Sequence, residues 1–285
     1  MAGNTLKVMA GRRLSQRRGQ AQPDGPYEGV PNHMRHALIH WLNTEIIDPY
    51  QRGTSSNERS IRELASFMRL DVEATWAAKT VADTLVAEAE GDDDYFLDLV
   101  DGALQLYGHE YKGKRLAQLL DTAGSVWTVA DDYKSLVRVV SDEAQATFDL
   151  AVSATDEAAT ELRVAWSNAF GRNGDPSDAW DHAIKAMEAL FIPLVIPKKD
   201  KANLGGVIGE LRNQGHVWKM VLPGKNDDND VSPIVGMLDG IWPNIDRHQG
   251  NAKNRPPTEP EARAVVTLAA TIVQWHREGW VVQRR

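Results

Sequence analysis

Apolar residues recur at spacings of three and four along almost the whole chain after Pro31, and this periodicity constrains the fold most strongly. Such spacing places apolar side chains on one face of an α-helix. The breaks between periodic segments are rich in Gly, Pro, Asn and Asp, which favour turns. The pattern predicts helices over residues 31–46, 57–70, 72–89, 95–107, 143–170, 176–192, 204–211, 232–242 and 258–278. We therefore expect an all-α protein.

Start and stop signals bound the helices of the second half. The signals are first-turn prolines after the caps Asp175 and Ser232, stops at Pro193, Pro197 and Pro243, a C-cap at Gly215, a capping box from Thr258 to Glu261, and a final Gly279. They predict four helices that share one core: about 156–170, 176–192, 232–242 and 258–278. This arrangement is a small four-helix bundle.

The chain divides by composition into three parts. Residues 1–30 are predicted to be a basic arm and linker, residues 31–145 an N-terminal helical domain, and residues 146–285 the C-terminal bundle, with an insertion at about 195–230. The net charge is −8, but Lys7 and four arginines give the first 20 residues a charge of +5. The acidic remainder argues against broad coating of duplex DNA. The arm is either a solvated tail or a nucleic-acid contact.

Several classes of protein are excluded by what the sequence lacks. With no cysteine, the chain has no disulfides, cysteine-ligated zinc or thiol catalysis. No apolar run is long enough for a membrane span, and no apolar segment follows the N-terminal arginines as in a secretory signal. The phosphate loop, the dinucleotide-binding glycine pattern, the nucleophile elbow and the kinase motifs are all absent. We expect a cytoplasmic protein without a cofactor and without membrane association.

The polar loop before the last helix contains the leading candidate site. Arg247, His248 and Asn251 put a cation, an imidazole and an amide on one connection between two helices. His exchanges a proton near neutral pH, and Arg holds a phosphate through paired hydrogen bonds. His248 would act as the base on a ribose hydroxyl, Arg247 as the phosphate clamp, and Asn251 as a polar orienter. The alternative is a solvated loop in which Arg247 pairs with Asp246.

A reserve site for RNA binding lies in the predicted insertion. Arg212, Asn213 and His216 again combine a cation, an amide and an imidazole, and Lys198 and Lys199 add charge that would hold a phosphate backbone. The alternative for Arg212 is ordinary helix-end chemistry, since basic residues favour the last turn of a helix.

Three histidines near the start of the periodic region have the spacing of a helix face. His33, His36 and His40 could ligate a metal together with Glu45 or Asp48. No recognised metal motif accompanies them, so we favour a surface or packing role and expect no metal site.

Two stretches of the second half resemble a known family. They are residues 165–177 (AWSNAFGRNGDPS) with the following helix, and the pattern Leu238-x3-Trp242-x4-Arg247-His248-x-Gly250. Both resemble the C-terminal domain of bacterial and phage abortive-infection proteins, which is grouped with the HEPN superfamily. The resemblance implies a four-helix bundle that dimerises. It also implies a metal-independent endoribonuclease that acts in phage defence or as a toxin.

The first half has a resemblance of its own. Gly29-Val30-Pro31 and Ala37-Leu38-x2-Trp41-Leu42 are similar to the N-terminal domain of abortive-infection protein J-like chains.

The expected ribonuclease motif is incomplete, and two functions remain. The HEPN pattern has an Arg and a polar residue followed by a His several residues later, whereas His216 follows Arg212 too soon and Arg247 directly precedes His248. One reading is a homodimeric defence protein that binds RNA and cleaves it. The other is an inert helical interaction module, a defence regulator or toxin–antitoxin partner. In that reading, a bundle face with Trp242 and Trp275 binds a phage or host protein.

Overall fold

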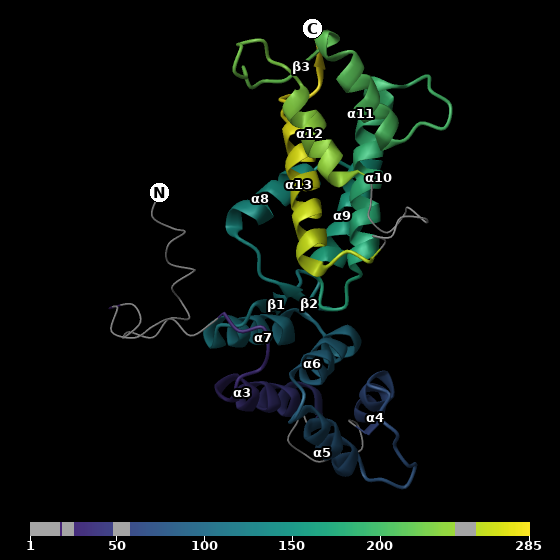
Figure 1. The fold of residues 1–285 in the computed structure, drawn as a ribbon. Coiled ribbons are helices and arrows are strands. Elements are labelled where there is room, and N and C mark those ends of the chain that lie inside the picture. The colour runs from purple at the N-terminus through teal and green to yellow at the C-terminus, as the bar shows by residue number, and fades with distance from the viewer. Residues whose placement is uncertain (1–17, 19–25, 48–57, 243–254) are drawn as a thin grey trace. The chain divides into compact units, whose positions relative to one another are not determined.

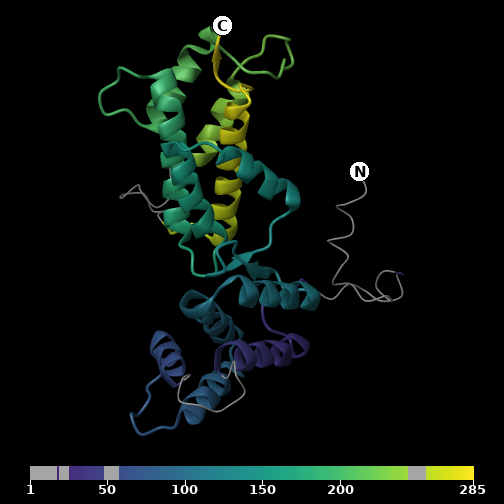
Figure 2. The ribbon, with the colours of Figure 1, turned by 180° about the vertical axis from the view of Figure 1, so that it is seen from behind.

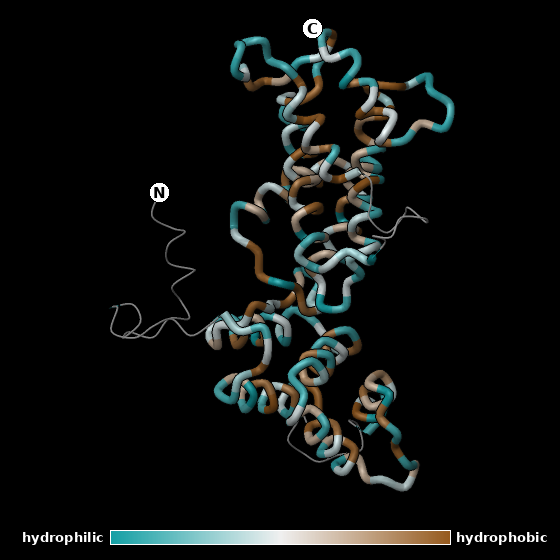
Figure 3. The backbone as a smooth tube through the Cα atoms, in the orientation of Figure 1, coloured by the Kyte–Doolittle hydropathy of each residue, from teal (hydrophilic) through white to brown (hydrophobic). Residues whose placement is uncertain are grey.

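The periodic apolar segments form α-helices, which confirms the helical class, and the few strands are short. The computed structural model describes Arg18 and residues 26–47, 58–242 and 255–285. The chain separates into two compact units, residues 1–139 and 140–285. Each unit has its own cluster of buried apolar side chains. Along the helices of both units, hydrophobic and hydrophilic positions alternate with the turns of the chain (Figure 3).

The N-terminal unit consists of helices followed by one small hairpin (Figures 1 and 2). Its elements are α3 (Asn32–Leu42), the π-helical turn η1 (Asn43–Ile47), α4 (Glu58–Phe67), α5 (Ala78–Ala89), α6 (Asp93–Tyr107), α7 (Glu110–Ala123), β1 (Trp127–Val129) and β2 (Leu136–Arg138). The two strands are antiparallel, with Trp127 opposite Arg138.

A buried carboxylate fastens the hairpin to α6. Asp101 is 1% exposed. Its Oδ1 accepts a hydrogen bond from the backbone N–H of Leu136 at 2.6 Å, and its Oδ2 accepts one from Gln105 at 2.8 Å. A buried carboxylate is tolerated only when such donors satisfy it. Asp101 therefore fixes β2 on the helical layer.

Residues 26–30, predicted to be linker, are instead part of the N-terminal unit. The backbone N–H of Tyr27 donates to the carbonyl of Gly124 at 2.8 Å, and the N–H of Val126 donates to the carbonyl of Tyr27 at 3.0 Å. Val30 is buried. Tyr27 and Val30 supply apolar surface within a polar stretch, and burying that surface orders the segment.

The helix predicted over residues 72–89 begins later, at Ala78. Residues 74–76 form a turn. Arg62 of α4 donates hydrogen bonds to the carbonyl of Trp76 at 2.6 Å and to the carbonyl of Ala74 at 3.5 Å. These carbonyls bind a side chain from another helix, which favours the turn over a longer α5.

The C-terminal unit is a helical bundle in which α9, α10 and α13 run side by side (Figures 1 and 2). Its elements are α8 (Asp142–Ala151), α9 (Glu157–Phe170), α10 (Pro176–Val195), α11 (Leu204–Asn213), the short 3₁₀ turn η3 (Gly215–Val217), β3 (Trp218–Lys219), α12 (Ser232–Ile241), α13 (Glu259–Arg277) and β4 (Gln283–Arg284). Strands β3 and β4 pair antiparallel.

Helix α10 lies at the centre of this unit and packs against α9, α11, α12 and α13. Its buried face includes Ala183, Ile184, Met187 and Phe191. The N-cap predicted at Asp175 is confirmed, since its carboxylate accepts hydrogen bonds from two backbone N–H groups of the first turn. The predicted insertion is integrated into the same core, because α11 and β3 bury apolar side chains there.

The long helix predicted over residues 143–170 is two helices, α8 and α9. Asp156 caps α9 by accepting a hydrogen bond from the N–H of Ala159 at 2.9 Å. Its carboxylate also binds Arg277 at the end of α13, and the Arg277 guanidinium contacts the carbonyl of Ala151 at the end of α8. Capping and this tertiary contact favour a break where the apolar periodicity alone would continue the helix.

Three predicted helix boundaries also differ from the structure. Pro193, predicted to stop α10, lies inside its last turns, and the helix continues to Val195. Ser232 is the first residue of α12 rather than its cap. Helix α11 ends at Asn213, and Gly215 begins η3 instead of capping α11. The predicted capping box of α13 is confirmed, and Gly279 follows that helix with a φ of +70°.

Candidate functional site

The leading candidates Arg247, His248 and Asn251 lie outside the described residues, but both ends of their connection are described. On the α12 side, Trp180 donates a buried hydrogen bond from Nε1 to the carbonyl of Ile241 at 2.7 Å. The next residue, Trp242, is half-buried and packs against the first turn of α11, where a Cβ on Gly205 would lie 2.9 Å from the Trp242 Nε1.

The other end of this connection is fixed by the start of α13. The N–H and hydroxyl of Thr258 each donate to Oε2 of Glu261 at 2.9 Å. Arg255 forms a two-pronged ion pair with the same carboxylate, at 2.5 and 2.7 Å. The hydrogen bond from Arg255, followed by those from Thr258, lowers the pKa of Glu261 to about 2. Glu261 is therefore an anion throughout the physiological range.

The reserve residues do not form one site. Arg212 forms an ion pair with Asp239 of α12, while Asn213 and His216 are exposed beyond it. Lys198 and Lys199 are exposed and precede the N-terminal end of α11. The Lys199 ammonium lies over the first turn of that helix. A helix of ten residues is about 15 Å long, so α11 separates the lysines from the Arg212 group.

The three histidines of α3 are exposed and do not converge. His33 contacts the carbonyl of Ala123 through Nε2 at 3.1 Å. Glu45, considered as a further ligand, is buried and pairs with Arg115. Within the described ranges, no three His, Cys, Asp or Glu residues are arranged to hold a metal ion. Asp48 lies outside those ranges.

His182 forms a polar bridge between α9 and α10. Its Nδ1 lies 2.5 Å from Oε2 of Glu161, and its Nε2 lies 3.5 Å from Oδ1 of Asp178. Asn168 donates to the second oxygen of Asp178 at 2.8 Å. Both ring nitrogens face a carboxylate of the protein, so this imidazole is placed to join two helices rather than to accept a substrate proton.

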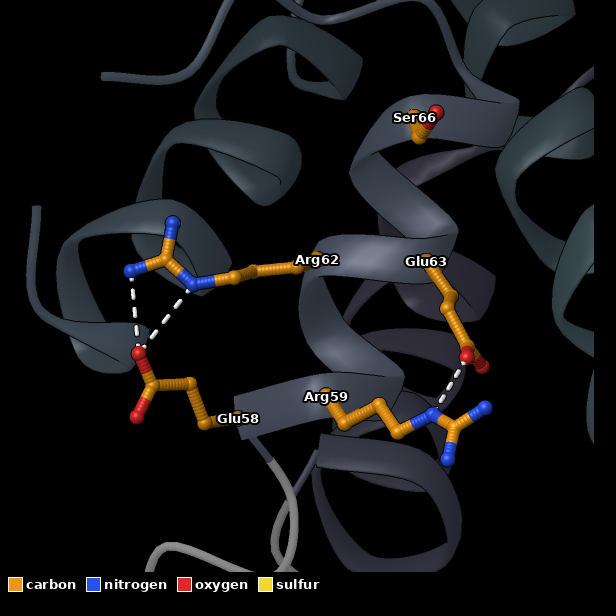
Figure 4. Close-up of a pocket in the computed structure, with 5 residues that line it drawn as sticks. All are labelled: Glu58, Arg59, Arg62, Glu63 and Ser66. Atoms are coloured by element: carbon orange, nitrogen blue, oxygen red, sulfur yellow. Dashed lines mark hydrogen bonds and ion pairs between the residues drawn. The ribbon is translucent and has the colours of Figure 1, made fainter. Parts of the chain in front are cut away.

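A hollow of about 550 Å³ lies on α4 (Figure 4). Its lining residues are Glu58, Arg59, Arg62, Glu63 and Ser66. Each arginine pairs with a glutamate one turn away on the same helix, at 3.0 Å for Arg62 and 2.7 Å for Arg59. Each of these charges therefore already has a partner, which leaves the hollow poorly suited to binding a charged ligand.

A second hollow, of about 450 Å³, lies where α9 begins and α13 ends. Its lining combines Asp156, Glu157, His276 and Arg277 with a wall of Ala158, Ala189, Leu190, Pro193 and Leu194. Burial, supported by the charge of Arg277, lowers the pKa of His276. The imidazole is thus neutral at pH 7 and available as a proton acceptor or a hydrogen-bond donor.

Sequence reasoning missed this second hollow. Its only local signal is the adjacent pair His276 and Arg277 in the last turn of α13, and basic residues are common there for purely helical reasons. The partners come from α9 and α10, more than 80 residues earlier in the chain. No motif spacing links them.

No helix in the part of the chain that the structure describes combines the length and apolar character needed to cross a membrane. Comparisons with protein-family models, with curated proteins and with solved structures find no match to this chain.

Proposed function

We propose that this chain is a defence protein of the abortive-infection type whose C-terminal bundle binds RNA and cleaves it without a metal ion. In this proposal the bundle is HEPN-like and pairs as a homodimer. His248 is the base, Arg247 the phosphate clamp and Asn251 the orienting amide. The proposal takes its substrate and reaction from the resemblance of residues 165–177 and 238–250 to that family.

One observation carries the proposal: the connection that contains Arg247 and His248 starts and ends on anchored residues. The Trp180 hydrogen bond holds the end of α12, and the Thr258–Glu261–Arg255 cluster holds the start of α13. Reactive groups are commonly placed on connections that a rigid scaffold supports. Two fixed ends also reduce the conformational entropy that the connection loses when a substrate orders it.

The exposed lysines before α11 support a role in holding the RNA backbone. Lys199 lies over the first turn of α11, beside the glycine against which Trp242 packs. It is thus close to Trp242, the last described residue before the 243–254 connection. A cation there would neutralise a phosphate of a strand that reaches His248.

The salt dependence of RNA binding tests this assignment. Each phosphate contact on a single strand changes the slope of log K against log salt by about 0.7. The double variant Lys198→Gln, Lys199→Gln should bind a single-stranded RNA more weakly, with a slope shallower by about one contact or more. The variant Lys79→Gln changes a paired lysine of the N-terminal unit and is the control. A slope unchanged in the double variant would contradict the role of these lysines.

A second candidate function, protein interaction, is favoured by apolar side chains at one end of the bundle. Val217, Val221, Leu222 and Trp280 are between 39% and 54% exposed. The N–H of Val221 donates to the carbonyl of Trp280 at 2.7 Å, so the two segments adjoin. The tryptophans first considered for such a face, Trp242 and Trp275, are half-buried against the core instead.

Self-association and RNA binding, measured together, separate this second function from the first. If the chain dimerises through this end, Leu222→Asp should give a monomer in sedimentation while RNA binding survives. If RNA binding is absent and the dimer depends on Leu222, the interaction module is the better account.

A further inference from the structure

The hollow bounded by α9, α10 and α13 has the two-sided lining of a small-ligand site. One side is apolar and comes mainly from α10, with Leu190, Pro193 and Leu194. The other side is polar and comes from the start of α9 and the end of α13. Sites for organic ligands of this size combine an apolar wall with a few fixed polar groups.

Pro193 changes the hydrogen bonding of this wall. In an α-helix the N–H of residue 193 would donate to the carbonyl of Ala189, but proline has no N–H. The Ala189 carbonyl therefore lacks its regular helical donor, and Ala189 lines the hollow. A hydrogen bond from a ligand to this carbonyl oxygen would therefore be favourable.

His276 contributes a donor. Its Nδ1 is enclosed by protein atoms and has no hydrogen-bond partner, and its ring lies 6.0 Å from that of Phe191. A proton on Nδ1 would be an unsatisfied buried donor, so the neutral ring carries its proton on Nε2. His276 lines the hollow, and Nε2 is the nitrogen left to meet a ligand.

The charges of the polar side are mostly cancelled. Arg277 and Asp156 are bound to each other at 2.6 and 2.8 Å. The guanidinium is a rigid planar group, and this pair fixes its position beside the hollow. The carboxylate of Glu157 remains as a second acceptor on the rim.

We infer that this hollow binds an amino-substituted nucleobase, with the exocyclic amine at the Ala189 carbonyl or the Glu157 carboxylate and a ring nitrogen at Nε2 of His276. An amino-substituted nucleobase has the required flat apolar faces and an edge where an amine adjoins an acceptor nitrogen. The choice of a nucleobase among flat heterocycles rests on the proposed RNA function. The base comes either from single-stranded RNA or from a free nucleotide.

Binding of mononucleotides to the full chain tests the inference. Isothermal titration calorimetry should show saturable binding of AMP, CMP and GMP, whose bases carry an exocyclic amine. UMP is titrated in the same way. UMP should bind about tenfold more weakly, because it has no exocyclic amine to satisfy the two acceptors. A short single-stranded RNA that competes with AMP identifies RNA as the source, and one that does not compete identifies the free nucleotide.

Two variants locate the ligand in this hollow. His276→Phe keeps the ring but removes both nitrogens, and Ala189→Phe fills the space. Both should reduce AMP affinity about tenfold or more. His109→Phe changes an exposed histidine of the N-terminal unit and is the control. His276→Phe also removes an unsatisfied buried nitrogen, so its thermal midpoint should not fall and the loss cannot be ascribed to unfolding.

Absence of mononucleotide and RNA binding, or AMP binding that both variants leave unchanged, would overturn the inference. This failure differs from failure of the proposed function. His248→Ala should abolish cleavage and leave AMP binding intact. The proposed nuclease function and the proposed nucleobase site can therefore fail independently of each other.

Discussion

Arg277 at the end of α13 forms a two-pronged ion pair with Asp156, the N-cap of α9, with Nη1–Oδ2 and Nη2–Oδ1 distances of 2.6 and 2.8 Å. The pair joins residues 121 positions apart in the chain. It also brings the end of α8 to the same guanidinium through the carbonyl of Ala151. The pair therefore ties three helix ends together and forms one side of the hollow bounded by α9, α10 and α13.

Loss of this pair should destabilise the C-terminal unit. Arg277→Met keeps much of the aliphatic stem and removes the charge, leaving Asp156 without its main partner. We expect the free energy of unfolding to fall by about 1 kcal/mol, because the pair is two-pronged but Asp156 is 44% exposed. Urea denaturation measures the loss. Arg263→Met, which breaks a pair within α13, should cost less than about 0.5 kcal/mol. Equal effects of the two variants would contradict the role given to Arg277.

Acidification should destabilise the protein in two separate windows. Burial lowers the pKa of folded His276, so the unfolded state binds more protons below about pH 6.5, and stability falls as the pH drops through that value. The hydrogen bond from Arg277 lowers the pKa of folded Asp156, so its stabilising contribution is lost only below about pH 4. His276→Phe should flatten the profile between about pH 7 and 5 and leave the lower window unchanged. If stability depends on pH in His276→Phe as it does in the parent protein, a group other than His276 causes the loss of stability in the upper window.

The helical class and several caps follow from local sequence, whereas the breaks and the hollow do not. Thr258 and Glu261 are three residues apart, so their capping box is visible in the sequence. The break between α8 and α9 depends on Arg277, which is distant in sequence and close only after folding. The continuation of α10 past Pro193 likewise depends on packing against other helices, which outweighs the missing hydrogen bond.

The anchor at the end of α12 is a single buried hydrogen bond. Trp180→Phe retains most of the apolar contact but leaves the Ile241 carbonyl without its donor. The expected loss in unfolding free energy is about 1 kcal/mol by urea denaturation. The same variant should slow RNA cleavage, because the connection to His248 begins two residues later. A variant as active as the parent would show that this anchor does not position the site.

Each unit should fold without the other, because each buries its own apolar cluster. A fragment of residues 140–285 should give helical circular dichroism and one cooperative thermal transition. The matched fragment of residues 26–139 should do the same. A C-terminal fragment that unfolds without cooperativity would contradict the independence of its core.

Incubation of total cellular RNA with the purified full chain shows whether the protein cleaves RNA through His248 and without a metal ion. Reactions run with and without EDTA, with His248→Ala as the test variant and His109→Ala as a control that changes an exposed histidine of the N-terminal unit. Cleavage should resist EDTA, be lost in His248→Ala and persist in His109→Ala, with the thermal midpoints of all three proteins nearly equal. Cleavage that survives in His248→Ala, or that EDTA abolishes, would contradict the proposed function.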